Sequence, residues 1–257
     1  CNSNNIIGFN AGYKAKDNNK SNFIGFQAGE WTDDVDWCDA IGVNAGRFAS
    51  GIDNAVFLGI DAGGSTKKLV NNVSIGNSAG AHSNGDEWTT NIGYQAGFEG
   101  SGSTNGISIG DYAGYKSTKS KQRVALGYKA QEHASGVRSF VAIGANAGAG
   151  ASGWKDEAKT LPYIPGHSVY STSLHQYSIG IGSDAAKATQ NTNQLIAIGR
   201  RAGSFTYDAQ HVIALGYRAG IQRKENDHSI YIGRDAGKYS DSDGDPPTVA
   251  GGSHQLF

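Results

Sequence analysis

Aromatic and histidine side chains gather in one segment of this 257-residue sequence, 149–178, where we expect a binding site. An aromatic ring offers a broad apolar face, and tyrosine and tryptophan add a polar tip, so such rings suit sugars and receptor surfaces. We predict that the ligand-binding residues there are Trp154, Tyr163, His167, Tyr170 and His175. The alternative is that the segment packs for shape or against a neighbouring chain, and the sequence leaves both open.

Three further tryptophans stand beside carboxylates. Trp31 and Trp37 belong to the acidic segment 30–38, and Trp88 follows two acidic residues. An aromatic ring can stack on a sugar ring, and a carboxylate beside it can accept hydrogen bonds from the sugar hydroxyl groups. We therefore add these three tryptophans to the predicted ligand-binding residues. A role in covering the fold or in a subunit contact is the alternative for each of them.

An acidic stretch near the end of the sequence is the one candidate for a metal site. Asp241, Asp243 and Asp245 alternate around a glycine, and carboxylates in such a pattern can wrap Ca²⁺. The distal glutamate of an EF-hand is missing, so a solvated acidic tail is the alternative. The seven histidines show no spacing typical of metal ligands, and we expect no other cofactor.

Catalytic motifs are missing from the sequence, so we expect that the protein is not an enzyme. It contains no Gly-x-Ser-x-Gly motif, no phosphate-binding P-loop and no His-Glu-x-x-His motif. A glycan-cleaving site could draw two carboxylates from the Asp-rich segments, but nothing in the sequence sets their separation.

We predict no disulfide between the two cysteines, Cys1 and Cys38. They are 37 residues apart, so in a stack of 17-residue coils they would lie two coils apart and at different positions of the coil, a poor geometry for a bridge. A lipoprotein exposes a cysteine at its first position after its signal peptide is cleaved. A lipid on Cys1 is therefore a hypothesis, and it is the one membrane contact that we expect, because the sequence has no apolar span of ~20 residues.

Charge and composition narrow the classes of partner. The net charge is −1, so no basic face for nucleic acid or for an anionic membrane is indicated. Glycine contributes 38 of the 257 residues, and this share is about twice the usual ~7%. These glycines do not recur at every third position, which excludes collagen.

Most of the glycines belong to an internal repeat, Ile/Leu-Gly-x-x-Ala-Gly, which occurs in 13 copies. Successive copies recur with a period of 17, except for one longer gap between Gly144 and Gly182. Together, the first and second glycines of the repeat account for 24 of the 38. The first glycines are Gly8, Gly25, Gly42, Gly59, Gly76, Gly93, Gly110, Gly127, Gly144, Gly182, Gly199, Gly216 and Gly233.

Each copy predicts one short β-strand that ends at the first glycine. Triplets such as Val124-Ala125-Leu126 alternate as a strand does, and we expect the aliphatic residues to face inward and the small middle residue outward. Glycine suits the corners, where the backbone needs a positive φ or a close approach.

One copy cannot bury its own apolar face, so the copies must stack. We predict an all-β, parallel β-solenoid of 13 coils of 17 residues, a rod of roughly 60 Å. The solenoid is expected over 1–240 with an insertion at about 149–178, followed by a tail or cap at 241–257. Asn5, Asn22 and Asp39 replace aliphatic residues in the first three copies, so that end should pack differently.

The repeat resembles the head repeat of trimeric autotransporter adhesins, the YadA-like head. The resemblance rests on strings such as 72–80 (Asn-Val-Ser-Ile-Gly-Asn-Ser-Ala-Gly) and 140–148, and the string 92–97 is also similar to repeats of phage tail-fibre proteins. It implies a left-handed β-roll, a homotrimer with three chains side by side, and a location at a cell or virion surface. The stalk heptads and the membrane anchor of a complete adhesin are not visible in this sequence.

A second resemblance is to the hexapeptide repeat of left-handed β-helix acyltransferases. Those enzymes carry three hexads per coil, whereas a single hexad per repeat is recognisable here. We therefore favour an extracellular adhesin or fibre whose loops, chiefly 149–178 and 30–38, bind a host receptor or surface glycan. The alternative is a structural filament without a ligand, which stacks end to end through the coils near 1–10 and 240–257.

Overall fold

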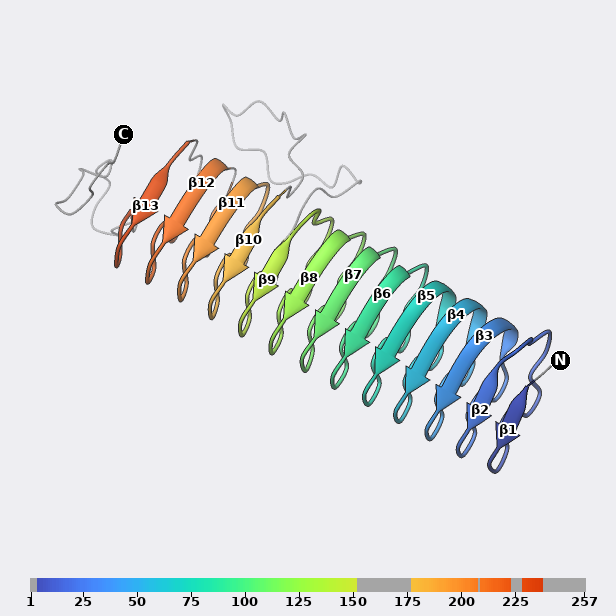
Figure 1. The fold of residues 1–257 in the computed structure, drawn as a ribbon. Coiled ribbons are helices and arrows are strands. Elements are labelled where there is room, and N and C mark those ends of the chain that lie inside the picture. The colour runs from blue at the N-terminus through green and yellow to red at the C-terminus, as the bar shows by residue number, and fades with distance from the viewer. Residues whose placement is uncertain (1–3, 152–176, 208, 223–227, 238–257) are drawn as a thin grey trace, which may run out of the picture.

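A single parallel β-sheet runs through the computed structural model, which describes residues 4–151, 177–207, 209–222 and 228–237. Thirteen strands follow one another in chain order, each hydrogen-bonded to the next, and the chain returns behind the sheet between them (Figure 1). The strands are β1 (Asn5–Ile7), β2 (Asn22–Ile24), β3 (Asp33–Ile41), β4 (Ser50–Leu58), β5 (Lys67–Ile75), β6 (Glu87–Ile92), β7 (Thr104–Ile109), β8 (Lys121–Leu126), β9 (Val141–Ile143), β10 (Ile179–Ile181), β11 (Asn193–Ile198), β12 (Gln210–Leu215) and β13 (Ile230–Ile232). The predicted parallel β-solenoid is thereby confirmed, while its left-handedness stays a prediction.

The pairing register places equivalent residues of successive copies side by side. Asn5 pairs with Asn22, and this offset of 17 recurs along the sheet. Across the long gap, Val141 pairs directly with Ile179, so the insertion interrupts the sequence pattern without shifting the register. The twelve steps between thirteen strands give a rod of roughly 58 Å at ~4.8 Å per step.

The side chains of the strands face the opposite way from our expectation. The middle residue of each triplet points inward, and Ala125 and Ala142 are fully buried. The aliphatic residues on either side point outward, and Ile109 and Ile143 keep 39% and 37% of their surface exposed. The predicted orientation was therefore wrong. Its physical cause is the thin coil, in which the middle residues of the triplets, most of them small, pack against the repeat alanines of the returning chain, as Ala125 does against Ala113 and Ala130.

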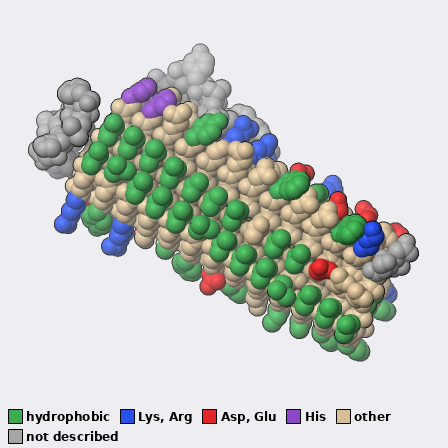
Figure 2. Space-filling view, viewed as in Figure 1, with side chains coloured by type: hydrophobic (Ala, Val, Ile, Leu, Met, Phe, Trp, Pro, Cys, Tyr) green, Lys and Arg blue, Asp and Glu red, His purple; other side chains and the backbone are tan. Residues whose placement is uncertain are grey.

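Outward-facing aliphatic side chains form two columns along the rod, which we call the outer sheet face. They appear in Figure 2 as rows of hydrophobic side chains over the strands. One column directly precedes the first glycines and runs from Ile7 to Ile232. The other lies two residues earlier and contains Val56, Val73, Thr90, Ile107, Val124, Val141, Ile179, Ile196, Ile213 and Ile230. The outer sheet face thus extends over ten strands with apolar residues in both columns except at Thr90.

The first three strands replace one of these columns with a polar ladder. Asn5 donates a side-chain hydrogen bond to Asn22 (2.7 Å), and Asn22 donates one to Asp39. Asn5, Asn22 and Asp39 therefore satisfy one another along the sheet. We predicted different packing at this end, and the structure assigns it to the outside of the coil.

The first glycine of each copy stands where neighbouring coils touch backbone to backbone. A Cβ atom on Gly76 would lie 2.5 Å from the carbonyl oxygen of Gly93. The φ angle of Gly76 is +129°, which L residues rarely adopt. Both the close approach and the backbone angle therefore require glycine at this corner.

The interior is apolar towards both ends of the rod and polar in the middle. Phe23, Phe57 and Leu69 belong to one buried apolar cluster, and Phe140 and Leu195 belong to another. Between them lie the buried polar side chains Asn72, Ser74, Asp86, Thr89, Asn91, Ser108 and Arg123. The solenoid therefore has two larger apolar cores separated by a polar section.

Asp86 and Arg123 are the charged residues of this polar section. Burial raises the pKa of the Asp86 carboxyl to about 6, against the opposing effects of a hydrogen bond from the Ser103 N–H (2.8 Å) and the charge of Arg123. Burial likewise lowers the pKa of Arg123 to about 10. Arg123 donates a hydrogen bond to Ser108 (2.9 Å), whereas its Nε and Nη1 atoms have no partner among the described residues.

Candidate functional site

Several predicted site residues lie outside the described residues. These are Trp154, Tyr163, His167, Tyr170 and His175 of the insertion, Asp241, Asp243 and Asp245 of the acidic stretch, and Cys1. Their proposed roles in ligand, calcium and lipid binding stay predictions.

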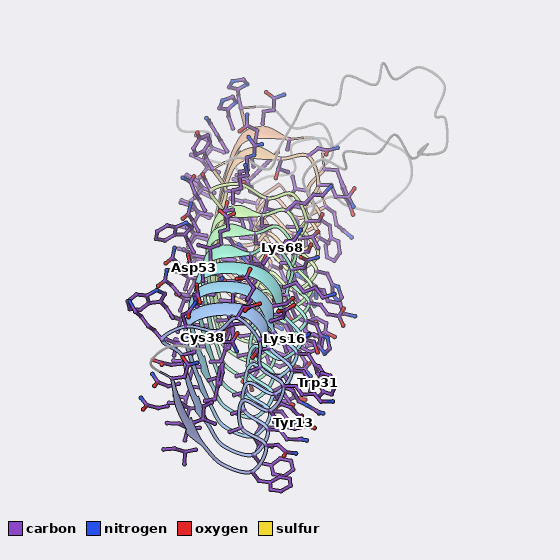
Figure 3. The ribbon with its side chains drawn as sticks, turned by 90° about the vertical axis from the view of Figure 1, so that its right-hand side faces the viewer. Tyr13, Lys16, Trp31, Cys38, Asp53 and Lys68 are labelled. Atoms are coloured by element: carbon purple, nitrogen blue, oxygen red, sulfur yellow. The ribbon has the colours of Figure 1, made fainter. Side chains whose placement is uncertain are left out.

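The structure separates the three remaining predicted tryptophans into two places. Trp37 and Trp88 occupy equivalent positions on β3 and β6, three strands apart, and they are 54% and 59% exposed. Trp31 lies instead in the turn after β2, next to Tyr13 (6.4 Å between ring centroids). Figure 3 shows Trp31 and Tyr13 on one side of the coil and Asp53 on the other. The three tryptophans therefore do not form one site.

Seven aromatic rings meet on the side of the rod that carries the turns after β5 to β8, and we call them the aromatic array. Each successive ring lies 5.2–6.3 Å from a neighbouring ring, measured between centroids. The array consists of His82, Tyr94, Phe98, Tyr112, Tyr115, Tyr128 and His133.

The geometry of the array leaves part of its ring surface open to solvent. Phe98 and Tyr115 stack with their planes 7° apart, and Tyr112 meets Tyr94 and Tyr128 edge to face. Such pairs contribute about 0.5–1.5 kcal/mol each beyond the burial of their surface. Tyr94 and Tyr128 remain 42% and 51% exposed, so the array supports the turns and also leaves ring surface open to solvent.

Charged side chains border the rings in matched pairs. The Nζ of Lys116 lies 3.2 Å from a carboxylate oxygen of Glu99, and this hydrogen bond raises the pKa of Lys116. The Nζ of Lys129 lies 3.5 Å from a carboxylate oxygen of Glu132. It also lies 5.6 and 5.5 Å from the ring centroids of Tyr112 and Tyr128. Because exposed ion pairs stabilise a fold by only ~0–1 kcal/mol, their main effect here is to place hydrogen-bonding groups beside the rings.

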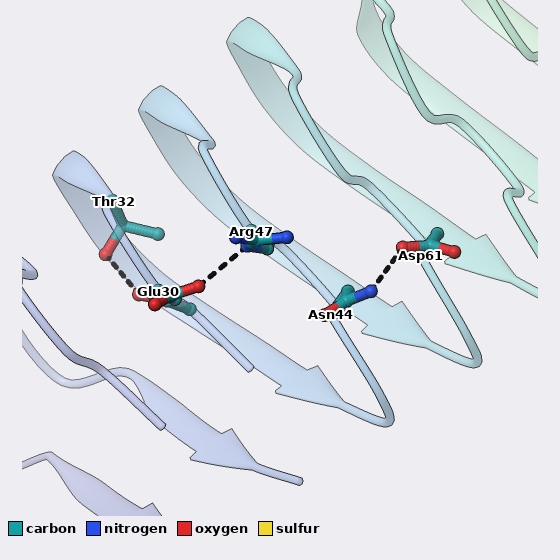
Figure 4. Close-up of polar contacts among 6 residues, drawn as sticks. Glu30, Thr32, Asn44, Arg47 and Asp61 are labelled. Carbon is teal, nitrogen blue, oxygen red and sulfur yellow. Dashed lines mark hydrogen bonds and ion pairs between the residues drawn. The ribbon is translucent and has the colours of Figure 1, made fainter. Parts of the chain in front are cut away.

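A shallow groove adjoins the array on the same side of the rod, and we call it the edge groove. Asn44 donates a hydrogen bond to Asp61 in its wall (3.0 Å), and the guanidinium of Arg47 is held by the buried carboxylate of Glu30 (2.7 Å; Figure 4). Its lining residues are Asn44, Arg47, Phe48, Asp61, Gly64, Ser65, Ser78, Ala81, His82 and Phe98. His82 and Phe98 belong to both features, so the groove and the array form one continuous edge.

Two further grooves are present in the described part of the chain. One lies on the equivalent turns nearer the C-terminal end and contains Asp184, Arg201, Phe205 and Arg218. The other contains Lys121, Gln122, Arg138 and Tyr177, at the start of the strands rather than after them. Neither contains the ring contacts that mark the aromatic array.

Sequence reasoning missed the aromatic array because its rings are spread thinly along the chain. Tyr94 and Tyr128 directly follow first glycines, and Phe98 and Tyr115 directly follow second glycines. Aligning the copies on their glycines is the signal that would have placed these residues in adjacent columns. Looking for aromatic-rich segments instead favoured 149–178 and 30–38.

Metal and thiol chemistry finds no support in the described residues. They contain no group of three His, Cys, Asp or Glu side chains that could hold a metal ion. Cys38 is a free, buried cysteine, and burial raises the pKa of its thiol far above its usual range, so it stays protonated. No helix long and apolar enough to cross a membrane occurs in this part of the chain.

Comparison of the chain with protein-family models and with curated proteins finds no match.

Proposed function

We propose that this protein is a surface adhesin or fibre, a stiff rod that assembles from several copies and presents its edges and loops for binding. The observation that carries this proposal is the outer sheet face. Exposed apolar surface costs about 25 cal/mol per Å² relative to burial, and large contiguous apolar patches mark interaction sites.

The shape of the outer sheet face favours a second copy of the chain as its occupant. Ten strands from β4 to β13 span roughly 43 Å, and they run parallel in one register (Figure 1). A straight apolar stripe of this length matches another stripe of the same period. The resemblance to trimeric adhesin heads supports three copies side by side, with their outer sheet faces towards a common axis.

The remaining parts of the proposal follow from this assembly. With the outer sheet faces covered, the turns stay available for a host receptor or surface glycan, and the insertion around 149–178 stays a predicted binding segment. A location outside the cell or on a virion fits a stiff rod with exposed binding edges. No catalytic role is proposed for any residue.

Light scattering on the purified full chain tests the assembly. We expect the mass of a trimer, which is three times the 26.8 kDa of the single chain. Leu126→Glu places a charge in the outer sheet face and should dissociate the assembly. Gln122→Glu places the same charge elsewhere on the same strand and should not.

For the unaltered protein, a measured mass equal to that of the single chain, 26.8 kDa, would contradict the proposal. Long fibres in negative-stain images, in place of discrete short rods, would favour the filament that stacks end to end.

A further inference from the structure

We infer that the edge groove and the aromatic array together bind an extended oligosaccharide. The inference rests on the proposed adhesin function, since it names the class of ligand and the place where the rod holds it. The ligand chain would lie along the rod, across the turns that follow β3 to β8.

The length and direction of this edge suit a linear chain of sugars. Phe48, 45% exposed, stands at one end of the edge, and Tyr128 stands near the other. The edge crosses five steps between coils, which is roughly 24 Å at ~4.8 Å per step. An extended chain of equatorially linked pyranose rings advances by about one coil per sugar, so several sugars can contact successive turns.

The chemistry of the edge provides both kinds of contact that a sugar needs. The C–H face of a pyranose ring packs on an aromatic ring, and the exposed surfaces of Tyr94 and Tyr128 offer such contacts. Hydroxyl groups need donors and acceptors nearby. Glu99 and Lys116 supply them beside the array, and Asp61 supplies a carboxylate in the groove.

The groove also contains a polar group that the fold leaves unpaired. The Oδ1 atom of Asn44 is buried and has no hydrogen-bond partner among the described residues, while its Nδ2 donates to Asp61. The amide is therefore held in one orientation, with its Nδ2 directed towards Asp61 in the wall of the groove. Arg47 is anchored next to it by Glu30, so the polar wall is rigid before a ligand arrives.

Charge and shape argue against the other occupants of this edge. Lys116 and Lys129 are each paired with a glutamate, so the edge has no net positive field for a nucleic acid backbone. A second copy of the chain fits the outer sheet face better, because that face is aliphatic and straight. The mixed aromatic and polar edge is typical of a site that binds a polar ligand with apolar faces.

A glycan array tests the inference with the full-length protein. The probes are printed linear hexamers of β-1,4-linked glucose and of β-1,4-linked N-acetylglucosamine, together with branched surface glycans. We expect binding to at least one linear hexamer, and the double variant Tyr112→Ala/Tyr115→Ala should bind it at least ~10-fold more weakly.

Two further variants separate binding from folding. Tyr217→Ala removes a tyrosine at the same repeat position as Tyr94 and Tyr128, but its ring lies among arginines outside the array, so binding should be unchanged. Asp61→Asn keeps the shape of the groove and every ring, and it should weaken binding while leaving the melting temperature near that of the unaltered protein.

The inference is overturned if no linear hexamer binds, or if both the double tyrosine variant and Asp61→Asn bind as the unaltered protein does. Mass measurement on the same samples keeps this result distinct from the proposed assembly. A trimer without glycan binding contradicts the inference alone, whereas a monomer that binds the hexamer contradicts the assembly alone.

Discussion

Crowding explains the second glycine, which 11 of the 13 copies contain. Gly63 has a φ of +61°, and non-glycine residues such as Asn10 and Lys14 adopt nearly the same angle in this chain. A Cβ on Gly63, however, would lie 2.3 Å from the ring of Phe57. Space rather than backbone angle therefore selects glycine at this corner.

One copy shows the same rule with the residues exchanged. Ala186 stands at the second glycine position with a φ of +49°, and the inward strand position of that copy is Gly180. The small residue has moved from the corner to the strand, so the two positions together keep about the same volume. A Cβ on Gly180 would lie 3.1 Å from that of Ala186.

This exchange predicts the result of a double substitution. Gly203→Ala should destabilise the protein by about 1–3 kcal/mol, because the new Cβ would lie 3.0 Å from that of Ala197. Adding Ala197→Gly should recover part of this loss, as in the natural pair of Ala186 and Gly180. Thermal unfolding of the two variants checks the prediction, and strictly additive losses would contradict it.

Along each strand, alternating large and small side chains identify two faces but do not show which of the two faces is buried. Val124 and Leu126 share one face of β8, and Ala125 lies on the other. In most β-sheets that cover a hydrophobic core, the larger apolar side chains lie on the buried face. Here the coil is too thin for two facing rows of aliphatic side chains, so the face with small residues is inside.

Matched substitutions on β8 test this orientation. Ala125→Leu should destabilise the protein by about 1–3 kcal/mol, because the fully buried position has no room for a longer side chain. Val124→Leu, on the outer sheet face, should destabilise it less, because this side chain points out of the coil and meets no packed interior. Thermal or urea unfolding measures both, and the reverse ranking would indicate that aliphatic residues face inward.

At the scale of the whole molecule, the two apolar cores are joined through a polar section that contains Asp86 and Arg123. Buried polar groups cost free energy unless their hydrogen bonds are made. The stability of the middle of the rod therefore depends more on internal hydrogen bonds and charges than the stability of its ends does. One such hydrogen bond is donated by the Ser103 N–H to Asp86.

Acidification should stabilise this polar section. The pKa of Asp86 is raised from 3.8 to about 6 in the folded protein, so the folded state binds this proton more tightly than the unfolded chain does. The free energy of unfolding should therefore rise as the pH falls from about 6 towards 4, by roughly 2 kcal/mol.

The variant Asp86→Asn isolates this contribution. It keeps an acceptor for the Ser103 N–H and cannot ionise, so its melting temperature should rise less than that of the unaltered protein between pH 6 and pH 4. Melting temperatures of both proteins across this range provide the measurement. Parallel curves would show that Asp86 does not titrate there.

The repeat alone was enough to predict the parallel solenoid and the pairing of equivalent residues, since copies that each expose an apolar strand must stack. Tertiary structure decided which strand face is buried, because that depends on the thickness of the coil and on the side chains across it. It also decided the aromatic array. Phe98 and Tyr115 are neighbours only because the register of the sheet superposes residues that lie far apart along the chain.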